Sequence, residues 1–143
     1  MLVKLQANDI TSLWDILKPS IATSLPPAIR ASDNTMNNIL KALLSDSMQC
    51  WAFYKDENIV ATVTTTILHD KPSGVRNLLI YSINGLERIQ ENWWKVGMKT
   101  LNEYAKAVGA SNIVGYTRLE YVKDLVVEKM KGNFEYFVSM EVK

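Results

Sequence analysis

Few side chains in this sequence combine the residue types and the spacing that catalysis requires. His69 and Asp70 are neighbours, and an imidazole next to a carboxylate can form a general base. Adjacent residues of a strand point to opposite faces, so a histidine at the edge of a loop is favoured over a catalytic pair. Cys50 is the only cysteine, which excludes an internal disulfide and a multi-cysteine zinc site. Its place between Gln49 and Trp51 indicates a small core side chain.

Two adjacent tryptophans form the other conspicuous pair. Trp94 shares the spacing of a buried helical face with Met98 and Leu101, so we expect it in the core. Trp93 lies about 100° further round the same helix. It is therefore either an exposed anchor for a protein interface or a simple packing residue, and the sequence leaves both alternatives open.

The composition narrows the class of protein. The 143 residues contain 16 Lys and Arg against 15 Asp and Glu, and the net charge of +1 lacks the basic excess of a non-specific nucleic-acid binder. Hydrophobic residues make up 48% of the chain and charged residues 22%, which is typical of a globular soluble protein. We expect one domain over residues 1–143, with no nucleic-acid partner, no membrane span and no metal. The lack of a long apolar segment near the N-terminus favours a cytoplasmic protein.

Hydrophobic periodicity divides the chain into strand and helix patterns. Helices are predicted over residues 10–21, 36–44, 94–108 and 122–130, and strands over residues 1–6, 48–55, 59–69, 76–83, 111–118 and 133–142. We expect 48–55 and 59–69 to form an antiparallel hairpin, and the nearly continuous apolar run at 76–83 to be the centre of the sheet. A crossover through the long helix makes 111–118 parallel to 76–83. Pro19 is expected to kink or end the first helix.

The order of these elements resembles the GNAT superfamily of N-acetyltransferases over essentially the whole chain. The likeness is carried by residues 103–142, where the long helix ends in an Ala-x-x-x-Gly pattern at Gly109. The last helix ends in Glu128-Lys129, followed by Gly132 and an aromatic strand. The resemblance implies an α/β (α+β) fold. In this fold a mixed, mostly antiparallel sheet of six or seven strands is flanked by about four helices.

The resemblance also implies a cofactor loop. In the family, an Arg/Gln-x-x-Gly-x-Gly/Ala loop before the long helix binds the pyrophosphate of acetyl-CoA through backbone amides. The two glycine positions correspond here to Asn92 and Trp94, with Ile89 at the first position, and a shifted alignment starts the loop at Gln90. Two indoles would crowd an anion that glycine lets approach the backbone, so we expect a degenerate loop and no cofactor. If the chain is an enzyme, the implied cofactor contacts are Ile83, Gln90, Asn92, Trp93, Trp94 and Lys95.

A catalytic acid and base are implied in the same way. Many family members use a tyrosine on the last helix to protonate the CoA thiolate, but the matching position here is Val127. Tyr121 and Tyr136 lie close in sequence and are the substitutes if the chain is an enzyme. Glu87 lies where many members keep the carboxylate that deprotonates the amine, although a solvated loop carboxylate is the favoured interpretation.

These departures favour a non-catalytic GNAT-like protein that acts through contacts with a protein partner or with itself. Residues 115–140 resemble small GNAT-like proteins of tailed bacteriophages, which implies a virion-associated protein, located in the virion or the host cytoplasm. The alternative is an acyl-CoA-dependent N-acetyltransferase with an atypical cofactor loop. In that case the backbone of the fourth strand pairs with pantetheine, and Glu87 or water is the base.

Overall fold

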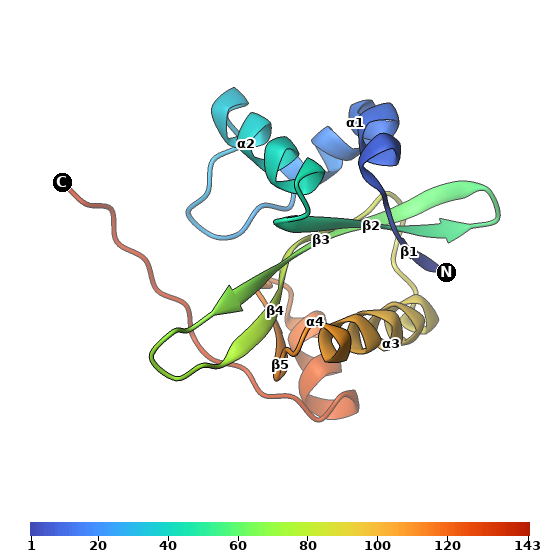
Figure 1. Cartoon of the computed structure of the whole chain (residues 1–143). Coiled ribbons are helices and arrows are strands. Elements are labelled where there is room, and N and C mark those ends of the chain that lie inside the picture. Colours follow the sequence, from blue (N-terminus) through green and yellow to red (C-terminus); the bar gives the residue numbers. More distant parts are fainter.

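The computed structural model describes all residues from Met1 to Lys143 (Figure 1). Strands and helices alternate along the chain much as the periodicity predicts. The elements are β1 (Leu2–Lys4), α1 (Ala7–Ala22), α2 (Asp33–Leu44), β2 (Met48–Lys55), β3 (Asn58–His69), β4 (Arg76–Gly85), α3 (Glu91–Ala107), β5 (Asn112–Gly115), α4 (Glu120–Asp124) and the π-helical turn η1 (Leu125–Lys129). None of the helices combines the length and the apolar character needed to span a lipid bilayer.

The antiparallel pairing of β2 and β3 confirms the predicted hairpin of 48–55 and 59–69. Lys55 pairs with Asn58, so Asp56 and Glu57 alone make the turn. Asp56 has a left-handed backbone with φ of 58°, a conformation that aspartate tolerates better than most residues. The turn chemistry therefore agrees with the strand pattern on either side of it.

The sheet contains five strands in the order β1-β2-β3-β4-β5. The first four are antiparallel neighbours, and β5 runs parallel to β4. This confirms the parallel pair, which α3 makes possible because parallel neighbours need a long crossover. The prediction that 76–83 is the central strand is wrong. The centre is β3, because β4 has only the short β5 beyond it.

The sheet is covered by α1 and α2 on one face and by α3 on the other (Figure 1). Alternation along β2 distributes its side chains between the two layers. Cys50 and Ala52 pack with α1 and α2, whereas Trp51 and Phe53 pack with α3. Each face of the sheet thus has its own hydrophobic cluster, and β2 contributes to both.

The α1–α2 layer includes a helix that continues through a proline. Pro19 has no backbone N–H to donate, which normally ends or kinks a helix. The helix nevertheless continues to Ala22, because Ser20 and Ile21 are buried against the sheet and the Ser20 hydroxyl bonds to Thr62. Tertiary packing overrides the local preference here. Ser32 starts the next helix by accepting a hydrogen bond from the backbone N–H of Thr35 (3.1 Å).

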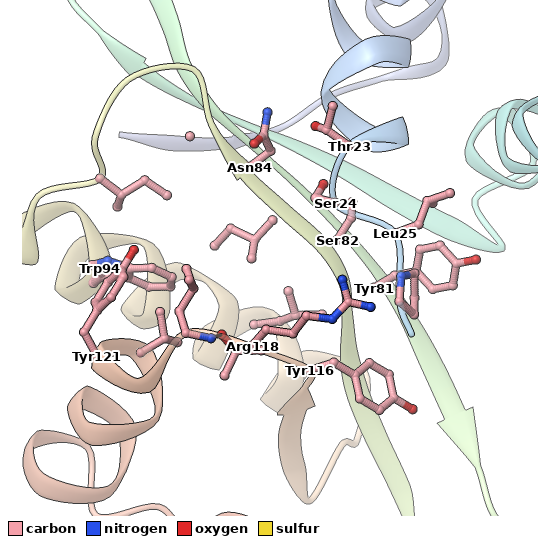
Figure 2. Close-up of a pocket in the computed structure, with 18 of the residues that line it drawn as sticks. Thr23, Ser24, Leu25, Tyr81, Ser82, Asn84, Trp94, Tyr116, Arg118 and Tyr121 are labelled. Carbon is pink, nitrogen blue, oxygen red and sulfur yellow. Dashed lines mark hydrogen bonds between the residues drawn. The ribbon is translucent and has the colours of Figure 1, made fainter. Parts of the chain in front are cut away.

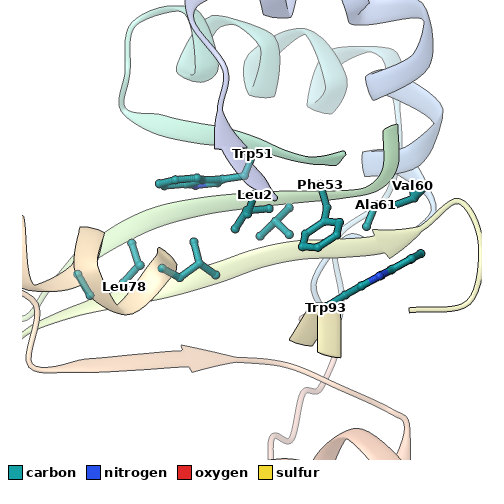
Figure 3. Packing of buried hydrophobic residues seen from close by; sticks show 10 residues of the cluster. Leu2, Trp51, Phe53, Val60, Ala61, Leu78 and Trp93 are labelled. Atoms are coloured by element: carbon teal, nitrogen blue, oxygen red, sulfur yellow. The ribbon is translucent and has the colours of Figure 1, made fainter. Parts of the chain in front are cut away.

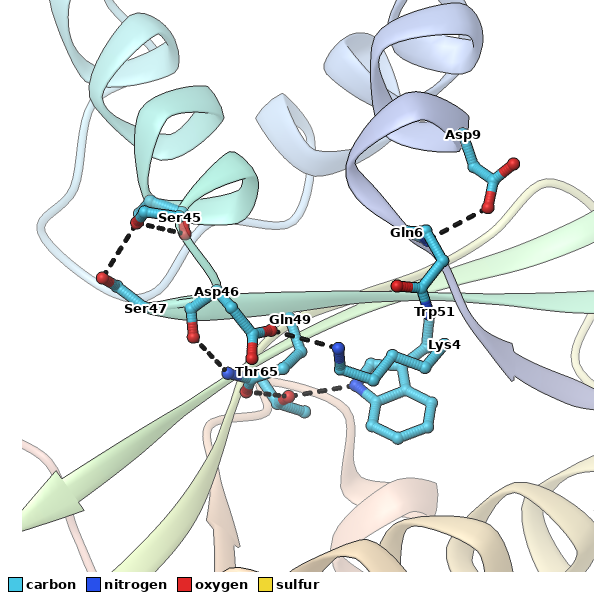
Figure 4. Close-up of polar contacts among 10 residues, drawn as sticks. Lys4, Gln6, Asp9, Ser45, Asp46, Ser47, Gln49, Trp51 and Thr65 are labelled. Carbon is cyan, nitrogen blue, oxygen red and sulfur yellow. Dashed lines mark hydrogen bonds and ion pairs between the residues drawn. The ribbon is translucent and has the colours of Figure 1, made fainter.

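Buried polar side chains near the start of β2 are fully paired (Figure 4). The indole N–H of Trp51 donates to the Thr65 hydroxyl (3.0 Å), and that hydroxyl donates to Gln49 Oε1 (2.9 Å). The Gln49 amide then donates to the carbonyl of Asp46 (3.0 Å). Pairing of this kind removes the cost of burying each group and fixes the Trp51 ring against the sheet.

The last part of the chain differs most from the prediction. Residues 133–143 form neither a helix nor a strand and make no backbone hydrogen bond, so the predicted strand 133–142 is wrong. The sheet consequently has five strands instead of six or seven. The predicted strand 111–118 is shortened to Asn112–Gly115, and the predicted helix 122–130 is replaced by α4 and η1.

Candidate functional site

The parallel strands β4 and β5 separate at one end of the sheet. Their pairing stops at Ile80 and Gly115, after which β4 continues alone to Gly85. On the other side of β4, Ile80 lies opposite Thr65 and Ser82 lies opposite Thr64, so Tyr81 is an extra residue in the strand. Such a bulge bends its strand and increases the local twist. One backbone edge of residues 81–85 is therefore left without a neighbouring strand.

A cavity of about 720 Å³ lies at this separation (Figure 2). Residues 80–85 of β4 and residues 116–119 after β5 line it, and residues 23–27 between α1 and α2 line it as well. Cavities of this size commonly hold small molecules or cofactors. The position at the carboxyl ends of two parallel strands is also where α/β sheets usually bind ligands.

Two arginines line this cavity from its two sides. Arg88 lies in the loop between β4 and α3, and Arg118 lies in the loop between β5 and α4. Neither guanidinium forms an ion pair within the chain. Figure 2 draws the Arg118 side chain across the opening near Tyr81 and Ser82. The cavity can therefore offer two unpaired positive charges to an anionic ligand.

The loop between β4 and α3 turns tightly to bring Arg88 to the cavity. Gly85 ends β4, and a side chain there would place its Cβ 2.4 Å from the carbonyl oxygen of Glu87. Only glycine fits this close approach. Glu87 also lines the cavity, but its side chain is 52% exposed and its carboxylate lies 3.9 Å from the ammonium group of Lys55.

The N-terminus of α3 follows directly. Gln90 precedes the helix without a side-chain cap, and the backbone amides of Glu91 and Asn92 donate to no backbone carbonyl. The Glu91 carboxylate accepts a hydrogen bond from the Lys129 ammonium group (2.6 Å). That bond and the positive charge of Lys129 hold the pKa of Glu91 below its usual value. Asn92 and Lys95 are exposed, and neither lines the cavity.

The structure decides between the two alternatives for Trp93 in favour of packing, and it corrects the expectation that Trp94 is a core residue. Trp93 is only 9% exposed and stacks on Phe53, with ring centroids 5.4 Å apart (Figure 3). Trp94 is half-buried and lines the cavity. The two indoles thus turn to different sides of α3, and Trp93 is used in packing within the chain. Trp94 thus forms part of the cavity wall, whereas Trp93 packs in the core beneath α3.

A set of buried hydroxyl and amide groups lies beneath the cavity, and the sequence patterns did not identify it. Asn84 donates to the Ser20 hydroxyl (2.9 Å), which shares a hydrogen bond of 2.6 Å with Thr62. Ser82 bonds to the Thr64 hydroxyl in the same way. Asn84 and Ser82 also line the cavity. These bonds join α1 to β3 and β4 and hold the floor of the cavity in place.

The remaining candidates divide between this cavity and the rest of the surface. Tyr121 and Ile83 line the cavity, whereas Tyr136 is 90% exposed and contacts only the ring of Phe134 among the aromatic residues. No group of three or more His, Cys, Asp or Glu side chains could hold a metal ion. Val127, the family's acid position, is exposed.

Neither the His69–Asp70 pair nor Cys50 belongs to the cavity. Asp70 accepts hydrogen bonds from the backbone N–H of Ser73 (3.2 Å) and from its hydroxyl, so it stabilises the turn after His69 instead of pairing with the imidazole. Cys50 is fully buried, as expected, and burial raises the pKa of its thiol from 9.0 to about 12.

The sequence did not single out Arg88 and Arg118, although one signal could have found them. Arg118 is the last residue of the predicted strand 111–118 and Arg88 follows the predicted strand 76–83, and the carboxyl ends of parallel strands meet at one edge of a sheet. Charged residues at or after the ends of both strands are therefore candidates for a common site.

No protein-family model and no curated protein matches this sequence. Solved structures do match. A predicted acetyltransferase from Clostridium acetobutylicum, solved with acetyl-CoA, has a TM-score of 0.68 and 18% identity and covers 100% of this chain and 95% of its own. A ribosomal-protein-alanine N-acetyltransferase from Brucella melitensis biovar Abortus 2308 has a TM-score of 0.67 and 14% identity, covering 100% and 97%. An aminoglycoside acetyltransferase from an uncultured soil metagenomic sample has a TM-score of 0.71 and 15% identity, also covering 100% and 97%.

These similarities correct two expectations. The similar structures are acetyltransferases and include complexes with CoA or acetyl-CoA, which contradicts the expectation of a non-catalytic scaffold without a cofactor. Nothing in them indicates a bacteriophage protein. With the mixed sheet, the helices on both of its faces and the separated β4 and β5, this chain has the fold of the GNAT acetyltransferases.

Proposed function

We propose that this protein is an acyl-CoA-dependent N-acetyltransferase. The observation that carries the proposal is the cavity of about 720 Å³ between β4 and β5, bordered by a strand edge without a neighbour. Acetyl-CoA combines an extended arm that contains amide groups with a strongly anionic end. The residues around the cavity fit both parts.

The strand edge suits the extended arm. Residues 81–85 have backbone N–H and C=O groups on the side where β5 no longer pairs, and an extended ligand with amides can bond to them as an added strand would. Ile80, Ile83 and Ile89 line the same space and offer apolar contacts to the arm. This arrangement would place the thioester, at the end of the extended arm, in the cavity.

The charged end is matched by positive groups. Arg88 and Arg118 are unpaired within the chain, and the start of α3 adds free amides and the positive end of the helix dipole. The Glu91 carboxylate is the acidic group of the first turn of α3, and it is paired with the Lys129 ammonium group. The positive charges of Arg88 and Arg118 would therefore bind the anionic end of the cofactor in place of the backbone contacts that the family's loop glycines allow.

Acetyl-CoA would supply an acetyl group carried on a thioester. For transfer, an acceptor amine must lose a proton, and the Glu87 carboxylate at the cavity can take it once it is free of Lys55, 3.9 Å away. The amine nitrogen would then bond to the acetyl carbon, the C–S bond of the thioester would break, and the Tyr121 hydroxyl, which also lines the cavity, would give its proton to the CoA thiolate that leaves. Tyr121 would replace the tyrosine that is absent at Val127.

The proposal is tested by calorimetric titration with acetyl-CoA. We expect a micromolar dissociation constant, and Arg88→Gln should weaken binding about tenfold because it removes a charge-assisted contact. Arg76→Gln is the matched control, because Arg76 starts β4 at the end away from the cavity and should bind as the wild type does. No binding at millimolar acetyl-CoA would refute the proposal.

A turnover assay tests acetyl transfer separately from the binding of acetyl-CoA. CoA release in the presence of a panel of amines can be followed with a thiol reagent, because the buried Cys50 gives little background. Tyr121→Phe should lower turnover and leave the dissociation constant for acetyl-CoA unchanged. An unchanged turnover would remove Tyr121 from the proposed acid role.

A further inference from the structure

The cavity between β4 and β5 contains very little negative charge. Glu87 is the only carboxylate that lines it, whereas both Arg88 and Arg118 do. The Lys55 ammonium group, 3.9 Å from the Glu87 carboxylate, adds a further positive charge beside that carboxylate. An ammonium group that leaves water without a carboxylate to pair with loses its hydration and gains nothing in return. The cavity is therefore suited to one ammonium group, at Glu87.

The cavity wall that faces α1 and α2 is apolar and aromatic. Tyr81 and Leu25 line the cavity and also pack against the hydrophobic cluster under these two helices. Pro26 and Pro27 line the cavity from the same loop as Leu25. Burial raises the pKa of the Tyr81 hydroxyl, so this side chain stays neutral near pH 7. The wall thus suits an apolar group and gives a second ammonium group no negative charge.

A second tyrosine lines the cavity from the other strand. Tyr116 follows β5, and its ring contacts that of Phe137 with centroids 5.4 Å apart. Figure 2 shows Tyr81 and Tyr116 on one side of the cavity, and Trp94 and Tyr121 on the other. Aromatic rings bind other flat rings by stacking or by edge contacts. The two tyrosines therefore provide a place for an aromatic group away from Tyr121.

The positions along β4 set the length of a molecule that would reach both ends of the cavity. Tyr81 and Gly85 are four residues apart, which in an extended strand corresponds to up to about 13 Å. Glu87 follows Gly85 and lies beyond the end of the strand. A molecule that places an amine at Glu87 and a ring at Tyr81 must therefore carry a spacer of several atoms between the two.

We propose that the acceptor is a primary amine with a single positive charge, joined through a spacer of several atoms to an aromatic group that Tyr81 and Tyr116 bind. This inference rests on the proposed function, since it names the class of amine that the transferase would acetylate. A polyamine of the same length would bring a second ammonium group to a wall without a carboxylate. The cavity should therefore select against it.

The rate of CoA release with 4-phenylbutylamine and with spermidine tests this selection. The two acceptors have similar lengths, but spermidine carries further ammonium groups where the other has a ring. We expect kcat/KM to be at least about tenfold higher for 4-phenylbutylamine. An equal or higher value for spermidine overturns the inference. No turnover of 4-phenylbutylamine by protein that binds acetyl-CoA also overturns it and leaves the cofactor part of the proposed function intact.

Direct binding of the amines gives a readout that does not need the cofactor. Calorimetric titration of the chain without acetyl-CoA should give a dissociation constant for 4-phenylbutylamine at least about tenfold below that for spermidine. This preference can hold even if acetyl-CoA fails to bind, which would refute the proposed function alone. Equal or weaker binding of 4-phenylbutylamine overturns the inference.

Variants of Tyr81 test the proposed place of the ring. Tyr81→Leu keeps an apolar side chain but removes the aromatic contact, and it should raise the KM for 4-phenylbutylamine about tenfold with kcat changed less than about twofold. Tyr81→Phe keeps the ring and should retain the KM of the wild type. Tyr54→Leu is the matched control, because Tyr54 is also half-buried against the α1–α2 cluster but does not line this cavity. Equal effects of Tyr81→Leu and Tyr54→Leu on KM would overturn the assignment.

Discussion

Replacing Trp93 by alanine should remove one of the largest single contributions to the core. The side chain is 9% exposed, stacks on Phe53 at 5.4 Å and has the Lys55 ammonium group 5.8 Å from its ring. A buried tryptophan removes up to about 250 Å² from water, which at about 25 cal/mol per Å² gives an upper limit near 6 kcal/mol. Because alanine keeps part of that burial and the site can relax, we expect a loss of about 3–5 kcal/mol.

Urea unfolding followed by far-ultraviolet circular dichroism measures this loss directly. Trp94→Ala is the matched control, since the same residue type one position along α3 is half-buried at the cavity and should cost about 1 kcal/mol. If Trp93→Ala leaves too little native protein to measure, Trp93→Phe keeps an aromatic ring and should still cost more than Trp94→Phe. Equal losses at the two positions would refute the assigned packing.

Three further outcomes follow from buried or paired groups. Lys129→Ala should raise the pKa of Glu91 toward its ordinary value, as measured by NMR titration. Because the pKa of Glu91 is lower in the folded than in the unfolded chain, the pair stabilises the fold above the unfolded-state pKa. This stabilisation is lost as the pH falls through the folded-state pKa. Cys50, with a pKa near 12, should react with a thiol reagent at pH 8 only after unfolding in urea, and stability should fall as pH rises above its unfolded pKa of 9.0. Ser20→Ala should cost about 1–3 kcal/mol in chemical denaturation, because the buried Thr62 hydroxyl loses its partner.

Sequence patterns predicted the elements whose evidence is local. The hairpin of β2 and β3 has its turn residues and its strand residues side by side in the chain, so both signals agree. The parallel placement of β5 followed from the intervening helix, because the connection permits little else. Cys50 was identified as core from strand alternation alone.

The tryptophans show where periodicity is ambiguous. Leu101 and Ala105 lie on the buried face of α3, and both Trp93 and Trp94 fall within a helical step of that face. A stripe that starts at either residue fits the sequence. Trp93 packs on Phe53, which lies in a distant part of the chain, and this contact places Trp93 on the buried face of α3.

Alternation gives a strand its faces but does not say which edge it joins. The segment 133–142 has the pattern of a strand and no strand beside it. The cavity shows the same limitation, because Arg88 and Arg118 are 30 positions apart and meet only through the parallel pairing of β4 and β5. Both features depend on which segments lie side by side in the folded protein. The residue pattern within one segment does not contain that information.

The additional residue at Tyr81 reverses the parity of β4. Leu78 and Ile80 face the α3 layer before it, and Ile83 faces the same layer after it, although an unbroken strand would turn Ile83 away. Deleting Tyr81 would leave Ile83 on the α3 side and Ser82 on the other face, because the residues on either side of the bulge already alternate, but it would remove the bend that the bulge gives to β4. An insertion of one residue, and not a change of residue type, is therefore what bends β4 where the opening lies.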